Sequence, residues 1–232
     1  MHSDLALMRF HVEALYTHDD NQRLRRTNEP GGGPAPRFFL GRTREGSIAR
    51  YRFDVPETTI RRLESLAGEE ISETSVPPKP KHFDVYKEIL EAHAPLQSVW
   101  MGPAYRVPVT GKLPHEGIRI TNENVHLLRG GFDWLAESID DEQPCVAIVR
   151  EGRAVTICRS VRITTAAHEA GIETLPKFRG KGYAVAAALG WSAAVAKIGC
   201  LPLYSTSWEN SASQRVAAKA ASVQYGVTLH IT

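Results

Sequence analysis

The order of strand-like and helix-like segments in the second half of this chain limits its fold more than any other feature. Short apolar runs, several of them alternating with polar residues, predict strands at residues 145–149, 154–158, 168–175, 203–206 and 225–231. Two helical segments lie between the later strands, an alanine-rich one at residues 182–198 and another at residues 210–221. Three strands followed by alternating helices and strands predict an α/β fold, with a mixed sheet and helices on its faces.

The first half of the chain has weaker patterns. Helices are predicted at residues 5–16, 58–66, 83–92, 122–128 and 132–139, and strands at residues 37–40, 47–53, 118–121 and 98–109, the last broken at Gly102-Pro103. The run V-P-P-K-P at residues 76–80 fits either an interdomain linker or an ordered surface loop. We expect an N-terminal region of unknown fold at residues 1–112, followed by the α/β domain at residues 113–232.

Composition excludes several classes of protein. The 28 basic and 26 acidic residues give a net charge of +2, which is too balanced for a nucleic-acid partner or an acidic membrane surface. Three widely spaced cysteines form no C-x-x-C pair, so no metal site is expected. The apolar run at residues 182–196 is shorter than the ~20 residues of a membrane span, and residues 1–10 do not resemble a signal peptide. We therefore expect a cytoplasmic protein with no membrane partner, and we leave a homodimer open.

A glycine-rich turn, P-K-F-R-G-K-G-Y-A at residues 176–184, separates a predicted strand from the alanine-rich helix. Such a turn directs backbone N–H groups into a concave nest at a helix N-terminus, where the helix dipole adds positive charge. Gly180 and Gly182 let a ligand approach the backbone, and Arg179 and Lys181 suit phosphate oxygens. The turn therefore predicts a pyrophosphate cradle; the alternative is an ordinary glycine turn with solvated basic residues.

This turn and its surroundings resemble the GCN5-related N-acetyltransferases (GNAT). R-G-K-G-Y-A after I-E-T-L-P resembles motif A of that family, and E-A-G-I-E-T at residues 169–174 looks like its fourth strand. Residues 203–210 look like the fifth strand and the entry to a helix with the pattern N-x-x-S-x-x-V-x-x-K, which fits Asn210, Ser213, Val216 and Lys219. The resemblance covers residues 121–232 and is nearest to the zwittermicin A self-resistance type. It implies the GNAT fold, a central mixed and mostly antiparallel sheet with splayed strands 4 and 5, flanked by helices.

The resemblance implies acetyl-CoA as cosubstrate and no metal. The pantetheine arm would bond like an added strand to the backbone of Ile172, Glu173 and Thr174. The pyrophosphate would lie on the turn formed by Arg179, Gly180, Lys181, Gly182, Tyr183 and Ala184. Asn210 and Ser213 would complete the coenzyme side, Asn210 also serving as a helix cap. Gly171 within the strand predicts a bulge or a close approach, or else it merely spaces a surface strand.

The implied mechanism is direct attack of an amine on the thioester, which requires a base. Glu169 is the preferred candidate because it lies on the strand where several GNATs place a catalytic glutamate, and a carboxylate beside an apolar sheet has a raised pKa. His168 is the rival, because imidazole titrates near neutrality. The structural alternatives are a hydrogen-bonded strand residue for Glu169 and a solvated face for His168. Trp191, in the alanine-rich helix, is expected to be a packing residue.

Two departures from the family pattern stand out. Many GNATs carry a tyrosine acid about seven residues after the position of Asn210, and this chain has Ala217 there. Tyr204 or Tyr183 could replace it, or the thiolate could leave unprotonated. The usual last strand is also missing after residues 225–231, so the N-terminal region is expected to close the sheet.

The resemblance thus implies a bacterial-type transferase that moves an acetyl group from acetyl-CoA to an amine, either a small molecule or a protein. The alternative is a non-catalytic acyl-CoA-binding or sensing module, since the usual tyrosine is absent. A nucleotide-binding α/β protein is a third reading. We expect the N-terminal region to serve the acceptor side, because every coenzyme motif lies after Thr121.

Overall fold

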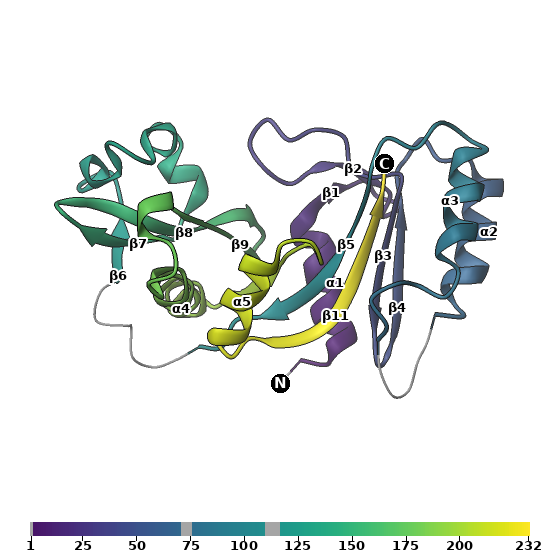
Figure 1. The fold of residues 1–232 in the computed structure, drawn as a ribbon. Coiled ribbons are helices and arrows are strands. Elements are labelled where there is room, and N and C mark those ends of the chain that lie inside the picture. The colour runs from purple at the N-terminus through teal and green to yellow at the C-terminus, as the bar shows by residue number, and fades with distance from the viewer. Residues whose placement is uncertain (1, 71–75, 110–116) are drawn as a thin grey trace. The chain divides into compact units, whose positions relative to one another are not determined.

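The computed structural model describes residues 2–70, 76–109 and 117–232 and divides into two compact units (Figure 1). Unit 1 comprises Met1–Ala104, Ser205–Asn210 and Gln224–Thr232, and unit 2 comprises Tyr105–Tyr204 and Ser211–Val223. The boundary predicted between residues 112 and 113 lies outside the described residues. Unit 1 therefore combines segments from both ends of the sequence.

Unit 1 is built on a sheet with the strand order β4-β3-β11-β5. Its elements are α1 (Asp4–Leu15), β1 (Tyr16–His18), β2 (Leu24–Thr27), β3 (Phe38–Thr43), β4 (Gly46–Tyr51), α2 (Glu57–Ala67), α3 (Phe83–Glu91), β5 (Val99–Arg106) and β11 (Val223–Ile231). Strand β3 pairs antiparallel with β4 on one side and with β11 on the other. The predicted helices and the β3–β4 hairpin are confirmed, because apolar periodicity alone sets them.

Helices cover both faces of the unit 1 sheet. On one face α2 and α3 lie side by side, and their apolar residues join Phe38, Leu40 and Leu229 of the strands in a hydrophobic core (Figure 1). On the other face α1 packs against β3 through Met8. A Cβ atom on Gly226 would lie 2.5 Å from Met8 Cε, so the absence of a side chain there lets the helix approach the sheet.

Strand β5 runs without interruption through Gly102-Pro103, so the predicted break is wrong. Gly102 is required at this point because a Cβ atom would lie 1.8 Å from the carbonyl oxygen of Thr206. The Pro103 carbonyl accepts a hydrogen bond from the Thr206 N–H at 3.3 Å. The proline lacks only a donor, and its acceptor still takes part in strand pairing.

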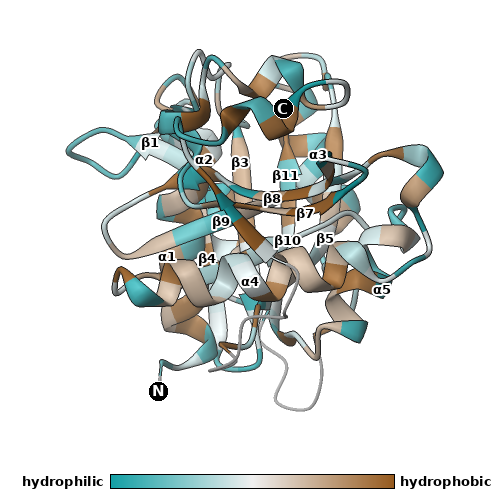
Figure 2. Cartoon of the chain, turned by 90° about the vertical axis from the view of Figure 1, so that its left-hand side faces the viewer, coloured by the Kyte–Doolittle hydropathy of each residue, from teal (hydrophilic) through white to brown (hydrophobic). Residues whose placement is uncertain are grey.

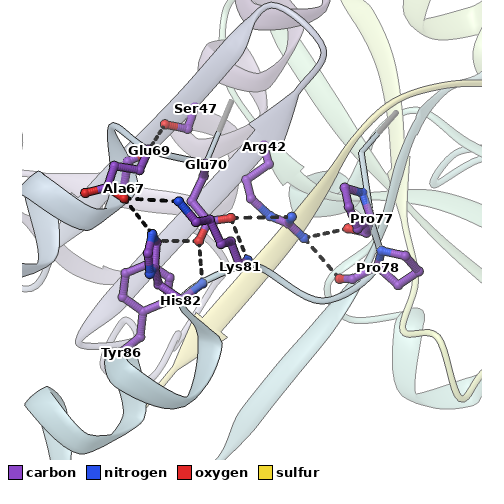
Figure 3. A network of polar contacts seen from close by, with 10 residues as sticks. All are labelled: Arg42, Ser47, Ala67, Glu69, Glu70, Pro77, Pro78, Lys81, His82 and Tyr86. Atoms are coloured by element: carbon purple, nitrogen blue, oxygen red, sulfur yellow. Dashed lines mark hydrogen bonds and ion pairs between the residues drawn. The ribbon is translucent and has the colours of Figure 1, made fainter. Parts of the chain in front are cut away.

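A buried network of polar contacts ties the loop at residues 76–82 to the unit 1 sheet (Figure 3). The Arg42 guanidinium lies 3.7 Å from the Glu70 carboxylate, and both side chains are buried. Arg42 also donates to the carbonyl oxygens of Pro77 and Pro78, at 2.8 and 3.0 Å. The proline-rich run therefore lies inside unit 1 as an ordered loop, and the linker reading is wrong.

Glu70 accepts three further hydrogen bonds in the same network (Figure 3). The donors are the backbone N–H groups of Lys81 and His82, both at 2.9 Å, and the Tyr86 hydroxyl at 3.0 Å. The carboxylate thus compensates its burial with one cation and three neutral donors. Burial lowers the pKa of Arg42, and burial together with Glu70 raises the pKa of Tyr86.

We expect Glu70→Ala to destabilise the protein by about 3–5 kcal/mol, because it leaves the Arg42 charge buried and unpaired. Glu69→Ala is the matched control, since the neighbouring carboxylate is exposed and pairs with Lys81 and His82 at the surface. Urea unfolding followed by circular dichroism measures both variants. Equal unfolding midpoints for the two variants would contradict a structural role for the buried pair.

Unit 2 contains five neighbouring strands of the nine-stranded sheet, in the order β10-β9-β8-β7-β6. Its elements are β6 (Gly117–Ile120), η1 (Val125–Leu128), η2 (Asp133–Leu135), η3 (Ile139–Glu142), β7 (Cys145–Arg150), β8 (Arg153–Ile163), β9 (Ala167–Thr174), η4 (Pro176–Phe178), α4 (Tyr183–Lys197), β10 (Leu201–Ser205) and α5 (Ser211–Lys219). All neighbours pair antiparallel except β9 and β10, which are parallel. The predicted mixed and mostly antiparallel α/β sheet flanked by helices is confirmed.

The two faces of the unit 2 sheet carry different layers. Helix α4 packs on β7, β8 and β9, where its small side chains and the buried Trp191 join the apolar strand residues seen in brown along β8 (Figure 2). The opposite face of the sheet is covered by η1, η2 and η3 through Leu128, Phe132, Leu135 and Ile139. The helices predicted at residues 122–128 and 132–139 are therefore short 3-10 turns. Trp191 is a packing residue, as expected.

Candidate active site

The pairing between the parallel strands β9 and β10 is short. It joins Leu201, Pro202 and Leu203 of β10 to Ala167, His168 and Glu169 of β9. Strand β8 pairs with β9 on the other side as far as Thr174. Within the described residues no pairing with β10 extends beyond Glu169, so the outer edge of residues 170–174 is open. The predicted splay of these two strands is confirmed.

The side chains of β9 alternate between the two faces of the sheet. Ala170 and Ile172 belong to the hydrophobic core under α4. By alternation Glu169, Gly171 and Glu173 lie on the opposite face, which the η segments cover. Glu169 is 2% exposed and occupies the last paired position before the strands part.

His168 lies on the α4 face and is buried, so the structural alternative of a solvated face is wrong. The residue is 4% exposed, and its Nδ1 is hydrogen-bonded to Ser160 Oγ at 2.8 Å. The same Oγ accepts the Trp191 Nε1–H at 3.0 Å. Burial lowers the pKa of His168. The two candidate bases therefore occupy opposite faces of one strand.

The sequence predicted a bulge or a close approach at Gly171, and the structure shows the close approach, while the bulge itself lies in the neighbouring strand β8. The register between β8 and β9 shifts between Ser160 and Arg162. A Cβ atom on Gly171 would lie 2.3 Å from Val161 Cγ1, so a larger residue would collide with the bulged strand. The reading of Gly171 as a mere spacer is wrong.

The glycine turn has the open geometry of a ligand cradle. Gly180 and Gly182 have φ angles of 77° and 81°, and a Cβ atom on either would meet no atom within 4 Å. Gly182 is the N-cap of α4, and within the described part of the chain no side chain caps this end. The Arg179 guanidinium donates from Nε to the Thr174 carbonyl at 3.2 Å, which ties the turn to the end of β9.

The other turn residues lie close to aromatic or cationic groups of unit 2. Lys181 Nζ lies 5.2 Å from the centre of the Phe178 ring. The Tyr183 hydroxyl accepts a hydrogen bond from Arg150 Nε at 3.2 Å. Ala184 is in the first turn of α4, directly after Tyr183.

Tyr204 of β10 is buried in the core on the α4 side, away from the face of Glu169. Burial is the main reason why its pKa is raised to about 12, and a hydrogen bond with Ser213 opposes the shift. The Tyr105 ring lies 6.4 Å away. Ala217, where the tyrosine acid was sought, is 1% exposed and packs in the same core.

Asn210 directly precedes α5, and Ser213 lies in its first turn. The Asn210 N–H donates to the Ser207 carbonyl at 3.1 Å and to Ser207 Oγ at 3.2 Å. Asn210 belongs to unit 1 and Ser213 to unit 2. The structure therefore gathers β9, the turn, Tyr204 and Ser213 in one unit.

Ser160 as partner of His168 was not predicted, because no local pattern signals a hydrogen bond between two strands.

Among the described residues no group of three or more His, Cys, Asp or Glu side chains could hold a metal ion. No helix of this part of the chain is both long and apolar enough to cross a membrane.

Comparison with known proteins returns solved structures only. No protein-family model and no curated protein sequence matches. A GCN5-related N-acetyltransferase from Sphaerobacter thermophilus is 14% identical, with 89% of this chain and 81% of that chain covered and a TM-score of 0.49. A GCN5-related N-acetyltransferase-like protein from Streptococcus suis is 14% identical, with 85% of both chains covered and a TM-score of 0.47. A GNAT-family structure from Novosphingobium aromaticivorans is 16% identical, with a TM-score of 0.46. The match covers 59% of this chain and 65% of that chain, so this chain spans slightly less than two thirds of its length. These values assign neither family nor activity.

The buried His168 predicts a pH dependence of stability. Because burial lowers its pKa from 6.5, the folded chain favours the neutral imidazole. The contribution of neutral His168 to the free energy of unfolding is fully present above pH ~6.5, and it is lost as the pH falls through the lowered pKa. The urea midpoint of the wild type should therefore drop more between about pH 7.5 and about pH 5 than that of His168→Gln. His126→Gln, at an exposed position, should behave like the wild type. Identical drops in all three proteins would contradict the assignment.

Proposed function

We propose that the chain is an acetyl-CoA-dependent N-acetyltransferase of the GNAT type, nearest to the zwittermicin A self-resistance type. The observation that carries this proposal is the parting of β9 from β10 directly beside Glu169, upstream of an open glycine turn. The open strand edge can bond an extended ligand, and the turn can bond phosphate oxygens. A coenzyme that combines an amide-containing arm with a pyrophosphate fits both features.

Different residues of unit 2 would bind different parts of the coenzyme. The edge formed by Ile172, Glu173 and Thr174 would bond the pantetheine arm, and the turn at residues 179–184 would hold the pyrophosphate. Ser213 would lie toward the coenzyme or the acceptor, and the coenzyme role expected for Asn210, which belongs to unit 1, stays a prediction. Because the Cβ positions of both turn glycines face open space, a ligand can approach the backbone there without displacing a side chain.

Glu169 is the base in this proposal. The amine nitrogen attacks the thioester carbonyl, the C–N bond forms, the C–S bond breaks and the thiolate leaves, while the carboxylate takes the proton of the amine. His168 is a weaker candidate, because its Nδ1 is hydrogen-bonded to Ser160 on the α4 face. The raised pKa expected for Glu169 stays a prediction.

Tyr204 is the candidate proton donor. Its pKa of about 12 keeps the hydroxyl protonated at neutral pH, and Ser213 orients it. A thiolate is nevertheless a tolerable leaving group, because the pKa of a free thiol is about 8.5. We therefore assign the larger share of catalysis to the base. Tyr183 is bonded to Arg150, which favours a role at the coenzyme turn.

The acceptor in this proposal is an amine of a small molecule or a protein in the cytoplasm, and the N-terminal region is proposed to serve the acceptor side. Calorimetry with acetyl-CoA, followed by a coenzyme A release assay over a panel of amines, tests the function. Binding with turnover on an amine supports it. Binding without turnover on any amine would favour a non-catalytic sensing module. Absence of binding would remove both readings.

We expect Arg179→Ala to weaken acetyl-CoA binding by about 1–3 kcal/mol, the scale of a charge-assisted hydrogen bond. Gly182→Val should abolish binding, because it adds bulk and backbone strain at the cradle. Gly199→Val is the matched control: its φ of +84° carries the same strain, it also faces open space, and it lies beyond the other end of α4. Calorimetry measures the affinities. Equal losses at Gly182 and Gly199 would refute the cradle.

Glu169→Gln should lower kcat by roughly 10²–10⁴ at pH 7, with partial recovery at higher pH. The recovery is expected because an amine with a pKa of about 10 is almost wholly protonated at pH 7 and loses its proton unaided as the pH rises. Steady-state coenzyme A release measures the rate. Tyr204→Phe is the comparison variant. If it loses more activity than Glu169→Gln, the two roles are wrongly assigned.

A further inference from the structure

One exposed tryptophan of unit 2 stacks on an arginine that is anchored by two carboxylates. Trp134 lies in η2 and is 50% exposed. The guanidinium carbon of Arg159 stacks over its ring, 4.6 Å from the ring centre. The guanidinium covers one face of the indole, and half of the residue stays open to a ligand.

Arg159 is itself fixed from two sides. Its Nε is hydrogen-bonded to Glu142 of η3, and its terminal nitrogen lies 3.1 Å from a Glu173 oxygen of β9. The side chains of Arg159 and Glu142 are each only 14% exposed. Because both ends of the guanidinium are bonded, the group on which the Trp134 ring stacks is held in place before any ligand arrives.

The same arginine lies on the face of the sheet that carries the proposed base. Arg159 pairs with Gly171 in the β8–β9 register, and its terminal nitrogen is 3.1 Å from where a Gly171 Cβ atom would be. Glu169 is two residues along the same strand on the same face, about 7 Å away along the backbone. Trp134 and Glu169 are thus presented by one face of one unit.

A second stack of the same kind in unit 1 shows what an ordinary surface pair looks like. Phe53 is 51% exposed and carries the Arg25 guanidinium 4.3 Å from its ring centre. The Arg25 side chain is 47% exposed and makes one ion pair, with Asp19 at 3.5 Å. Arg25 thus lacks the double anchoring that fixes Arg159 over Trp134. The two rings are almost equally exposed, so the pairs differ in how firmly the stacked arginine is held in place.

We propose that Trp134 is the platform for the acceptor and that the acceptor is a primary amine carrying a planar apolar group a few bonds from its nitrogen. This inference rests on the proposed function, because it takes Glu169 as the group that receives the amine proton. Because Trp134 stacks on Arg159, which lies on the same face of the sheet as Glu169, one acceptor addresses both residues in this proposal. An aliphatic amine of the same basicity gains no stacking partner there.

The test compares 2-phenylethylamine with butylamine as acceptors. It uses the wild type, Trp134→Ala, Trp134→Phe and Phe53→Ala. We expect the wild type to favour 2-phenylethylamine in kcat/KM by about tenfold or more, mainly through a lower KM. Trp134→Ala should bring the ratio of the two kcat/KM values toward one. Trp134→Phe should keep most of the preference for 2-phenylethylamine, and Phe53→Ala should keep all of it.

Calorimetry keeps this inference separate from the proposed function. Acetyl-CoA affinity is measured for every variant, and the affinity for each amine is measured with coenzyme A bound. A wild type that acetylates both amines equally well, or a Trp134→Ala variant that loses both equally, would overturn the platform. If acetyl-CoA fails to bind while 2-phenylethylamine binds in a Trp134-dependent manner, the proposed function fails and the platform stands. If neither ligand binds, both fail.

Discussion

Everything proposed for this protein depends on the point at which β9 loses its second neighbour. Three residues pair with β10, and along the next five every second residue directs its N–H and C=O groups to the open edge. Buried or half-buried backbone groups need partners, so such an edge is suited to a ligand with its own amide groups. The bulge at Val161 of β8 lies beside this point, and bulges increase local twist. The neighbouring strand thereby helps to turn β9 away from β10.

The parts of this arrangement that the sequence predicted are those encoded in contiguous residues. The glycine turn is one example, since Gly180 and Gly182 have the positive φ angles that their residue type allows. Most strand and helix positions followed from the spacing of apolar residues, and a glycine within a strand, Gly171, indicated a bulge or a close approach. The sequence left the faces unassigned: period two shows that His168 and Glu169 point in opposite directions, but not which direction holds α4.

Features assembled from distant segments left no local signal. Arg159, Glu142 and Glu173 come from three elements, and each looks like an ordinary surface charge in the sequence. The same holds for Arg42 and Glu70 of unit 1, whose burial no pattern indicated. The short turns at residues 122–142 were predicted as helices because apolar spacing alone does not distinguish a 3-10 turn from an α-helical one.

The pairing of β11 with β3 affects the order in which the chain can fold during synthesis. Strand β3 leaves the ribosome early, yet its partner β11 follows only after the 179 residues of positions 44–222. At typical elongation rates of about 5–20 residues per second, β3 waits roughly 9–36 s with one edge unpaired. Unpaired strand edges are sites of aggregation. The edge of β3 is therefore exposed to such pairing during that interval, whereas Tyr105–Tyr204, the contiguous part of unit 2, is complete before β11 is made.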